Sequence, residues 1–208
     1  MTFRADKAVI TAAAIVLCAS TATAGDAIDR FAERVAQSRV TFGYSYRVKG
    51  DIPLSGKGNI ELQGVCFKMT SNGVEIFSNG STRWTIDREA AECYIENAAT
   101  QERLTDPTSF LQSIGSAFIR TAERDSHFGN AGTRAYDLTP VSENSGIAEC
   151  TVHFNAADIP VGAEITTEDG TTTVFSISGM KFLNMSDSAD FNFDTGSLPA
   201  SYVVTDLR

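Results

Sequence analysis

Hydrophobic and polar residues alternate along most of the chain with the two-residue period of β-strands, and only two stretches have the period of a helix. In residues 26–38, Ile28, Phe31 and Val35 recur at helical spacing behind Asp26, a good N-cap residue. In residues 107–118, an apolar face follows Asp106-Pro107, which is typical of an N-cap with proline at the first helical position. The pattern therefore predicts two amphipathic helices.

The rest of the chain reads as short strands joined by tight turns. Asn72-Gly73 and Asn79-Gly80 are strong hairpin signals, because both central residues of such a turn need a positive φ. Residues 121–132 are polar and glycine-bearing, so we expect a loop there. The alternating segments are 42–46, 58–63, 65–70, 74–78, 84–86, 93–95, 134–139, 148–154, 175–177, 181–184 and 191–193.

About ten or eleven antiparallel strands cannot lie flat, because their twist curls the sheet towards closure. We therefore predict a mainly β (α+β) fold in which the curled sheet forms an incomplete barrel. Two or more helices would bury their apolar stripes against its open side. Residues 25–208 are expected to form one such domain.

The first 24 residues have the three parts of a secretory signal peptide. Arg4 and Lys7 precede the apolar run 8–19, and small residues lead to Ala24, after which we place the cleavage. The apolar run is short for a membrane span, and Cys18 follows Leu17 rather than the small residue of a lipoprotein signal. We therefore expect export to the periplasm.

The chain is acidic, with 26 acidic and 17 basic residues and a net charge of −9. Removal of the signal segment, which carries Arg4, Lys7 and Asp6, makes the remainder more negative by one. Such a protein repels phosphate backbones, so nucleic acid is not an expected partner, and tight electrostatic docking on anionic membranes is disfavoured. We expect a monomer.

The residues that carry chemistry form no recognisable catalytic or metal motif. Of the two histidines, His127 lies in the polar stretch and His153 alternates outward from Val152 and Phe154. No zinc spacing, nucleophile elbow, phosphate loop or dinucleotide fingerprint is present. Cys66, Cys93 and Cys150 remain after cleavage, and we interpret them as small buried hydrophobes, although one bridge between two of them stays open. No enzyme activity, cofactor or metal is expected.

Large apolar and aromatic side chains along the strands and the second helix are the most conspicuous functional candidates. A wide curled sheet with few helices need not fill its own interior, and the remainder would be an apolar ligand cavity. The residues predicted to line this lipid-binding cavity or its lid are Phe42, Tyr44, Phe67, Met69, Ile76, Trp84, Ile86, Phe110, Leu111, Ile114, Phe118, Phe175 and Ile177.

Several of these stretches together resemble the periplasmic outer-membrane lipoprotein carrier proteins (LolA-like), in a divergent branch. The resemblance is strongest over the hairpin 74–84, and it extends to residues 56–62, Asp106-Pro107 with Phe110-Leu111, 136–140 and 191–193. It implies a curved antiparallel sheet closed by helices, which carries lipoprotein acyl chains in a cavity that Phe42, Phe67, Trp84, Phe110, Leu111 and Phe118 would line. One departure is clear. Known carriers have an Arg-Pro whose arginine hydrogen-bonds the helical lid, and Gln63-Gly64 stands there instead.

The resemblance and the apolar pattern lead to the same expected function. The protein would bind lipoprotein acyl chains, or another lipid, and carry them from an inner-membrane donor to an outer-membrane acceptor protein. The alternative is an envelope sensor or scaffold that binds a protein partner, or a lipidated protein, without transport.

Overall fold

The computed structural model describes residues 26–49, 53–98, 107–129 and 134–208, which form twelve strands in one sheet, two α-helices and two 3-10 helices. The predicted signal peptide and Asp106 lie outside these residues. The strands are β1 (Arg39–Lys49), β2 (Leu54–Gln63), β3 (Cys66–Ser71), β4 (Val74–Ser78), β5 (Thr82–Asp87), β6 (Glu92–Asn97), β7 (Phe118–Asp125), β8 (Arg134–Pro140), β9 (Ile147–Phe154), β10 (Pro160–Thr167), β11 (Thr172–Leu183) and β12 (Val203–Asp206).

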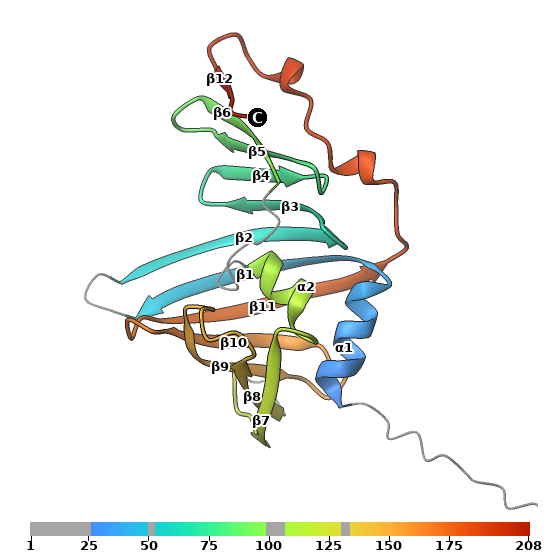
Figure 1. Cartoon of the computed structure of the whole chain (residues 1–208), viewed down its shortest axis with the longest axis vertical. Helices are drawn as coiled ribbons and strands as arrows, with labels where there is room; N and C mark the ends of the chain where they lie inside the picture. Colours follow the sequence, from blue (N-terminus) through green and yellow to red (C-terminus); the bar gives the residue numbers. More distant parts are fainter. Residues whose placement is uncertain (1–25, 50–52, 99–106, 130–133) are drawn as a thin grey trace, which may run out of the picture.

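The strands follow the order β12-β6-β5-β4-β3-β2-β1-β11-β10-β9-β8-β7, so β12 and β7 are the two free edges of an open, curled sheet (Figure 1). All neighbours pair antiparallel except β12 and β6, which are parallel. The predicted curled sheet with an incomplete closure is confirmed. Its halves meet where β1 pairs with β11, so the first and last long strands of the chain lie in the middle of the sheet.

Helix α1 (Ala27–Ala36) begins where the sequence predicted, because the Asp26 carboxylate accepts a hydrogen bond from the Asp29 backbone N–H at 3.0 Å. Its apolar stripe faces the sheet, and the Phe31 ring meets the edges of Phe154 and Phe182 at 5.9 and 6.3 Å between centroids. Helix α2 (Pro107–Ser113) packs against α1 on the same side of the sheet (Figure 1). We call this side the helix-covered face, and the opposite side the outer face.

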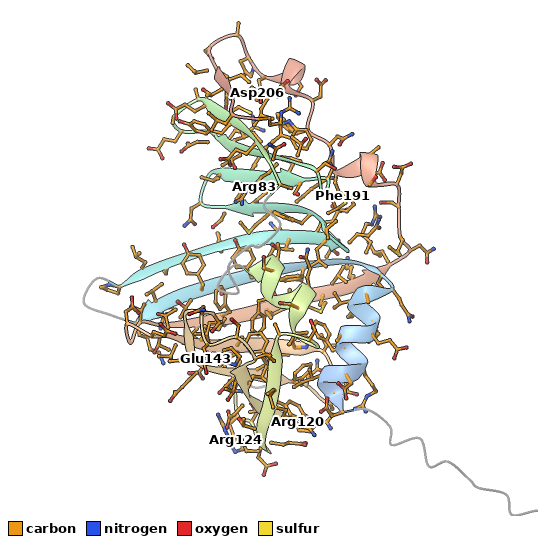
Figure 2. All side chains as sticks on the ribbon, in the orientation of Figure 1. Arg83, Arg120, Arg124, Glu143, Phe191 and Asp206 are labelled. Carbon is orange, nitrogen blue, oxygen red and sulfur yellow. The ribbon has the colours of Figure 1, made fainter. Side chains whose placement is uncertain are left out.

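The second predicted helix is too long, and the predicted loop after it is wrong. The helix ends at Ser113, and Phe118 begins strand β7, which runs to Asp125 through the stretch expected to be a loop. The strand was missed because it is an edge strand, exposed at every position after Phe118, and therefore lacks apolar alternation. Figure 2 shows its Arg120 and Arg124 at the free edge of the sheet.

The two predicted tight turns differ from one another. Asn72 and Gly73 have φ values of 48° and 87°, as a two-residue hairpin turn requires. At the second turn only Gly80 has a positive φ, and the Asn79 side chain closes a three-residue loop by accepting from the backbone N–H groups of Ser81 and Thr82. Both turns produce the expected antiparallel hairpins.

Residues 184–202, here named the C-terminal segment, leave β11 and cross the outer face of β3 to β6. The segment contains the 3-10 helices η1 (Ser188–Phe191) and η2 (Thr195–Ser197), and it leads into β12 (Figure 1). The segment predicted as a separate strand at 181–184 is the end of β11. The strand predicted at 191–193 is wrong, because Phe191 is the last residue of η1, whose N-cap is Asp187. Phe191 lies beside β3 (Figure 2). The Lys68 ammonium lies over its ring, 5.3 Å from the centroid.

No helix within the part of the chain that the structure describes has both the length and the apolar character that a membrane crossing requires.

Candidate lipid-binding site

A small apolar cavity lies between α2 and the helix-covered face, at the centre of the sheet. Its volume is about 30 Å³, which is room for one or two water molecules. Its lining comes from α2 and from β1, β9, β10 and β11, with Pro160 at the start of β10. The lining residues are Phe42, Tyr44, Phe110, Leu111, Val152, Pro160, Ala163, Ile165, Phe175 and Ile177.

An open apolar trough of about 250 Å³ lies beside this cavity and shares two lining residues with it. Tyr44 and Phe175 line both spaces, and the trough continues along β1 past Tyr46 and Val48. The Tyr46 ring lies 6.5 Å from Tyr44 and 6.2 Å from Phe175, so three aromatic rings form one wall. The Tyr44 hydroxyl donates to the Thr70 carbonyl at 3.3 Å, which leaves the apolar face of the ring to the cavity.

Helix α2 covers part of the cavity with its own side chains. Phe110 and Leu111 of α2 are each 5% exposed, and Ile114, directly after the helix, is 1% exposed, although the helix has only seven residues. The Phe110 ring packs against Phe118 at 5.2 Å between centroids, which connects α2 to the start of β7. A helix this short has little stability of its own, so these contacts hold it in place.

Six of the thirteen predicted site residues line the cavity itself. They are Phe42, Tyr44, Phe110, Leu111, Phe175 and Ile177. Met69 lines the trough. Phe67, Ile76, Ile114 and Phe118 belong to the same buried cluster without lining either space.

Trp84 and Ile86 lie elsewhere, on the outer face. Trp84 stands opposite Phe77 in the β4–β5 hairpin, and the neighbouring pair Ile76 and Thr85 points to the helix-covered side. Trp84 and Ile86 therefore join a second apolar cluster beneath the C-terminal segment, where Phe77 meets Phe193 at 4.9 Å. The structure does not bring these two residues to the cavity.

Four cavity residues were missed by the sequence reasoning. Val152 was recognised as part of an alternating strand but not as a lining residue, and Pro160, Ala163 and Ile165 belong to β10, which was not predicted. Ala163 and Ile165 alternate just before the Asp169-Gly170 turn, and this is the signal that could have revealed the strand.

His153 does not face solvent as predicted; it is 4% exposed on the outer face of β9. Its Nδ1 lies 2.8 Å from the hydroxyl of the buried Ser126, its Nε2 lies 3.5 Å from a Glu164 carboxylate oxygen, and Phe128 stacks on the ring at 4.6 Å. Burial lowers the pKa of His153 below its usual value, against the opposing effect of Glu164. The loop that follows β7 therefore covers this histidine.

Hydrolytic triads are built from the same residue types as Ser126, His153 and Glu164. Here, however, the three side chains form structural contacts rather than an accessible site. Ser126 is 4% exposed, and its Oγ also accepts the Phe128 backbone N–H at 3.2 Å. A nucleophile in such a triad must reach its substrate, and this hydroxyl is buried. His127, the neighbouring residue, is exposed.

The three cysteines of the described region are buried and free. The interpretation as small hydrophobes is confirmed, and the bridge that the sequence left open is not formed among them. Burial raises the pKa of the Cys150 thiol to about 12, with a smaller contribution from Asp137. Burial also raises the pKa of Cys66 and of Cys93.

No described protein family and no curated protein matches the sequence. Solved structures do match. An uncharacterized conserved protein from Thermus thermophilus aligns with a TM-score of 0.51 and 13% identity, over 86% of this chain and 96% of that one. A LolA superfamily protein from Nitrosomonas europaea aligns with a TM-score of 0.42 and 12% identity, over 81% and 99%. A DUF1329 family protein from Desulfovibrio piger gives 0.44 and 10%, over 84% and 97%.

At 13% identity the likeness to the Thermus thermophilus protein is one of fold. The open, curled sheet with helices against one face is the architecture that the LolA-like resemblance implied.

Proposed function

We propose that this protein is an exported envelope carrier that binds lipid acyl chains, from lipoproteins or another lipid, along its helix-covered face. The supporting observation is that the small cavity and the open trough lie side by side, with apolar side chains of β1 and β11 in both linings and with Tyr44 and Phe175 shared between them. Delivery between an inner-membrane donor and an outer-membrane acceptor is the corresponding role, after removal of residues 1–24 in the periplasm.

Binding requires α2 to move, because about 30 Å³ cannot hold an acyl chain. We infer that Phe110 and Leu111 occupy the place of the ligand, and that Ile114, directly after α2, is displaced together with them. Exposing three such side chains costs roughly 5–9 kcal/mol, at about 1.5–3 kcal/mol each. Each buried methylene returns about 0.8 kcal/mol, so about six to eleven methylenes offset the displacement. A chain of about 14 carbons or more has enough of them.

This exchange needs no bond to be made or broken in the ligand. The site holds the tail by apolar burial alone, and release follows when α2 returns. We therefore propose a binding role and no enzymatic one.

A fluorescent fatty acid titrated into the purified protein tests the proposal. Phe175→Asp places a carboxylate where cavity and trough meet and should weaken binding at least tenfold. Gln112→Asp is the matched control, because it adds the same charge to the exposed side of α2 and should leave the affinity within about twofold. Absence of binding to the wild type, with no lipid in the mass spectrum of protein purified from periplasm, would refute the carrier role.

The scaffold alternative has one observation in its favour, which is the small volume of the cavity. A protein that only binds a partner needs no space for a lipid. A stable complex with one envelope protein and no extractable lipid would support this second function.

A further inference from the structure

The lysines of this acidic protein lie on one surface. The sequence contains five, of which Lys7 is outside the described residues. The other four, Lys49, Lys57, Lys68 and Lys181, stand on the four adjacent strands β1, β2, β3 and β11. A net charge of −9 for the whole chain gives no reason to expect such a concentration.

Strand register places these lysines on the outer face. Lys57 is opposite Ser45, and Lys49 follows Ser45 by four residues on the same side of β1. Thr41 of β1 is opposite Lys181 of β11 on one side and Glu61 of β2 on the other. Glu61 is in turn opposite Lys68 of β3, so both lysines lie on the same face as Thr41. Arg39 and Arg47 extend the same side of β1. We call Arg47, Lys49, Lys57, Lys68 and Lys181 the outer basic face.

Carboxylates neutralise only part of this charge. Glu61 lies 3.6 Å from Arg39 and 4.0 Å from Lys68, and Glu164 lies 4.0 Å from Lys49. Glu164 also faces His153. Among the residues that the structure describes, Arg47, Lys57 and Lys181 have no ion-pair partner.

Further acidic residues limit the basic region at one end of the strands. The turn between β10 and β11 carries Glu168 and Asp169 beyond Lys49, and Asp51 falls outside the described residues. The excess of positive charge is therefore greatest between Arg47 and Lys181.

The outer basic face is hollowed along the strands. One hollow of about 640 Å³ is lined by Arg47, Lys49 and Lys57 together with the hydroxyls of Ser45, Ser55 and Ser176, and with Glu164 as its one carboxylate. A second, of about 620 Å³, is lined by Lys68 and Lys181 with Asn59, Thr70 and Ser178, and with Glu61 as its one carboxylate. Between them they follow β1 from Thr41 to Lys49, roughly 27 Å at about 3.3 Å per residue.

We propose that the outer basic face binds an extended acidic segment of a partner protein. Cations and hydroxyls in hollows that follow a strand suit a chain of carboxylate side chains about eight residues long. A flat anionic bilayer would contact only the rims of such hollows. Binding of this kind is steered by opposite charge and weakens as salt screens it. This surface is on the other side of the sheet from the acyl cavity, so the two sites are independent.

The test uses a fluorescein-labelled peptide of ten glutamates and aspartates, with fluorescence anisotropy at low salt. Lys57→Gln/Lys181→Gln should weaken binding at least tenfold. Arg124→Gln/Arg208→Gln removes the same two charges from exposed sites elsewhere and should change the affinity by less than about twofold.

Three results would overturn the proposal: no binding of the peptide by the wild type, an equal loss in both double variants, or a preference for vesicles of anionic phospholipid over the peptide. None of them bears on the acyl site, because the fatty-acid titration is read separately.

Discussion

The side-chain amide of Gln63 forms two hydrogen bonds with the backbone of Ser186. Its Nε2 donates to the Ser186 carbonyl at 2.8 Å, and its Oε1 accepts from the Ser186 N–H at 2.7 Å. Gln63 is 7% exposed at the end of β2, and Ser186 lies near the start of the C-terminal segment. The Gln63 side chain therefore anchors the C-terminal segment to the end of β2.

Loss of this anchor should loosen the segment without touching the cavity. Gln63→Leu leaves the N–H and the carbonyl of Ser186 without their partner, and we expect the free energy of unfolding to fall by about 1–3 kcal/mol. Urea unfolding measures the change, and the fluorescence of Trp84, the single tryptophan, should shift to the red. Gln37→Leu, at the exposed end of α1, is the control and should cost less than about 0.5 kcal/mol.

His153 should make the stability depend on pH. In the unfolded chain its pKa is about 6.5. Burial lowers the pKa in the folded protein, where Glu164, Asp137 and Arg124 also act on the ring. Below about pH 6.5 the unfolded chain therefore takes up a proton that the folded chain does not, and stability falls as the pH drops towards the folded pKa. Above about pH 6.5 the contribution is fully present.

Urea titrations at several pH values between 7.5 and 5 measure this effect. His153→Asn should flatten the dependence relative to the wild type, whereas His127→Asn, at an exposed position, should not. Identical slopes in the wild type and His153→Asn would show that the imidazole titrates alike in both states.

Trp84 should not contact the lipid, although the sequence pattern predicted that it would. Trp84→Phe keeps an aromatic ring in the outer cluster, so we expect a loss of about 1 kcal/mol of stability and a fatty-acid affinity within about twofold of the wild type. A large loss of affinity in the titration would mean that the ligand reaches the outer face.

Truncation of Phe110, the side chain proposed to occupy the ligand's position, should strengthen fatty-acid binding. Phe110→Ala removes part of the cost of opening, so the affinity for the fatty acid should rise roughly tenfold, equivalent to about 1.4 kcal/mol. Phe67→Ala is the matched control: Phe67 is equally buried in the same core but does not line the cavity. Both variants lose stability, and an increase in affinity shared by both would contradict the assignment to α2.

The elements that could be predicted are those in which apolar residues of a single buried face recur at regular spacing along the sequence. Helix α1, with Ile28 and Phe31 inward, and the strand around Phe42 and Tyr44 are of this kind. Strand β7 was not predictable, because an edge strand that is exposed to solvent on both faces has no alternation of apolar and polar residues.

The side on which a residue lies was harder to predict than the strand that holds it. In the β4–β5 hairpin both faces are apolar, with Ile76 against the helices and Trp84 under the C-terminal segment, and alternation alone cannot say which face is the inner one. His153 was misplaced for a related reason, because Phe128 covers it from a loop distant in the sequence. Such long-range cover leaves no local trace.

The displacement of α2 is the central claim, and amide hydrogen exchange with and without a saturating fatty acid measures it directly. We predict faster exchange in residues 108–114 and slower exchange in β1 and β11 when the ligand is bound. Unchanged or slower hydrogen exchange in α2, in protein shown to hold the fatty acid, would contradict the displacement of Phe110 and its neighbours by the ligand.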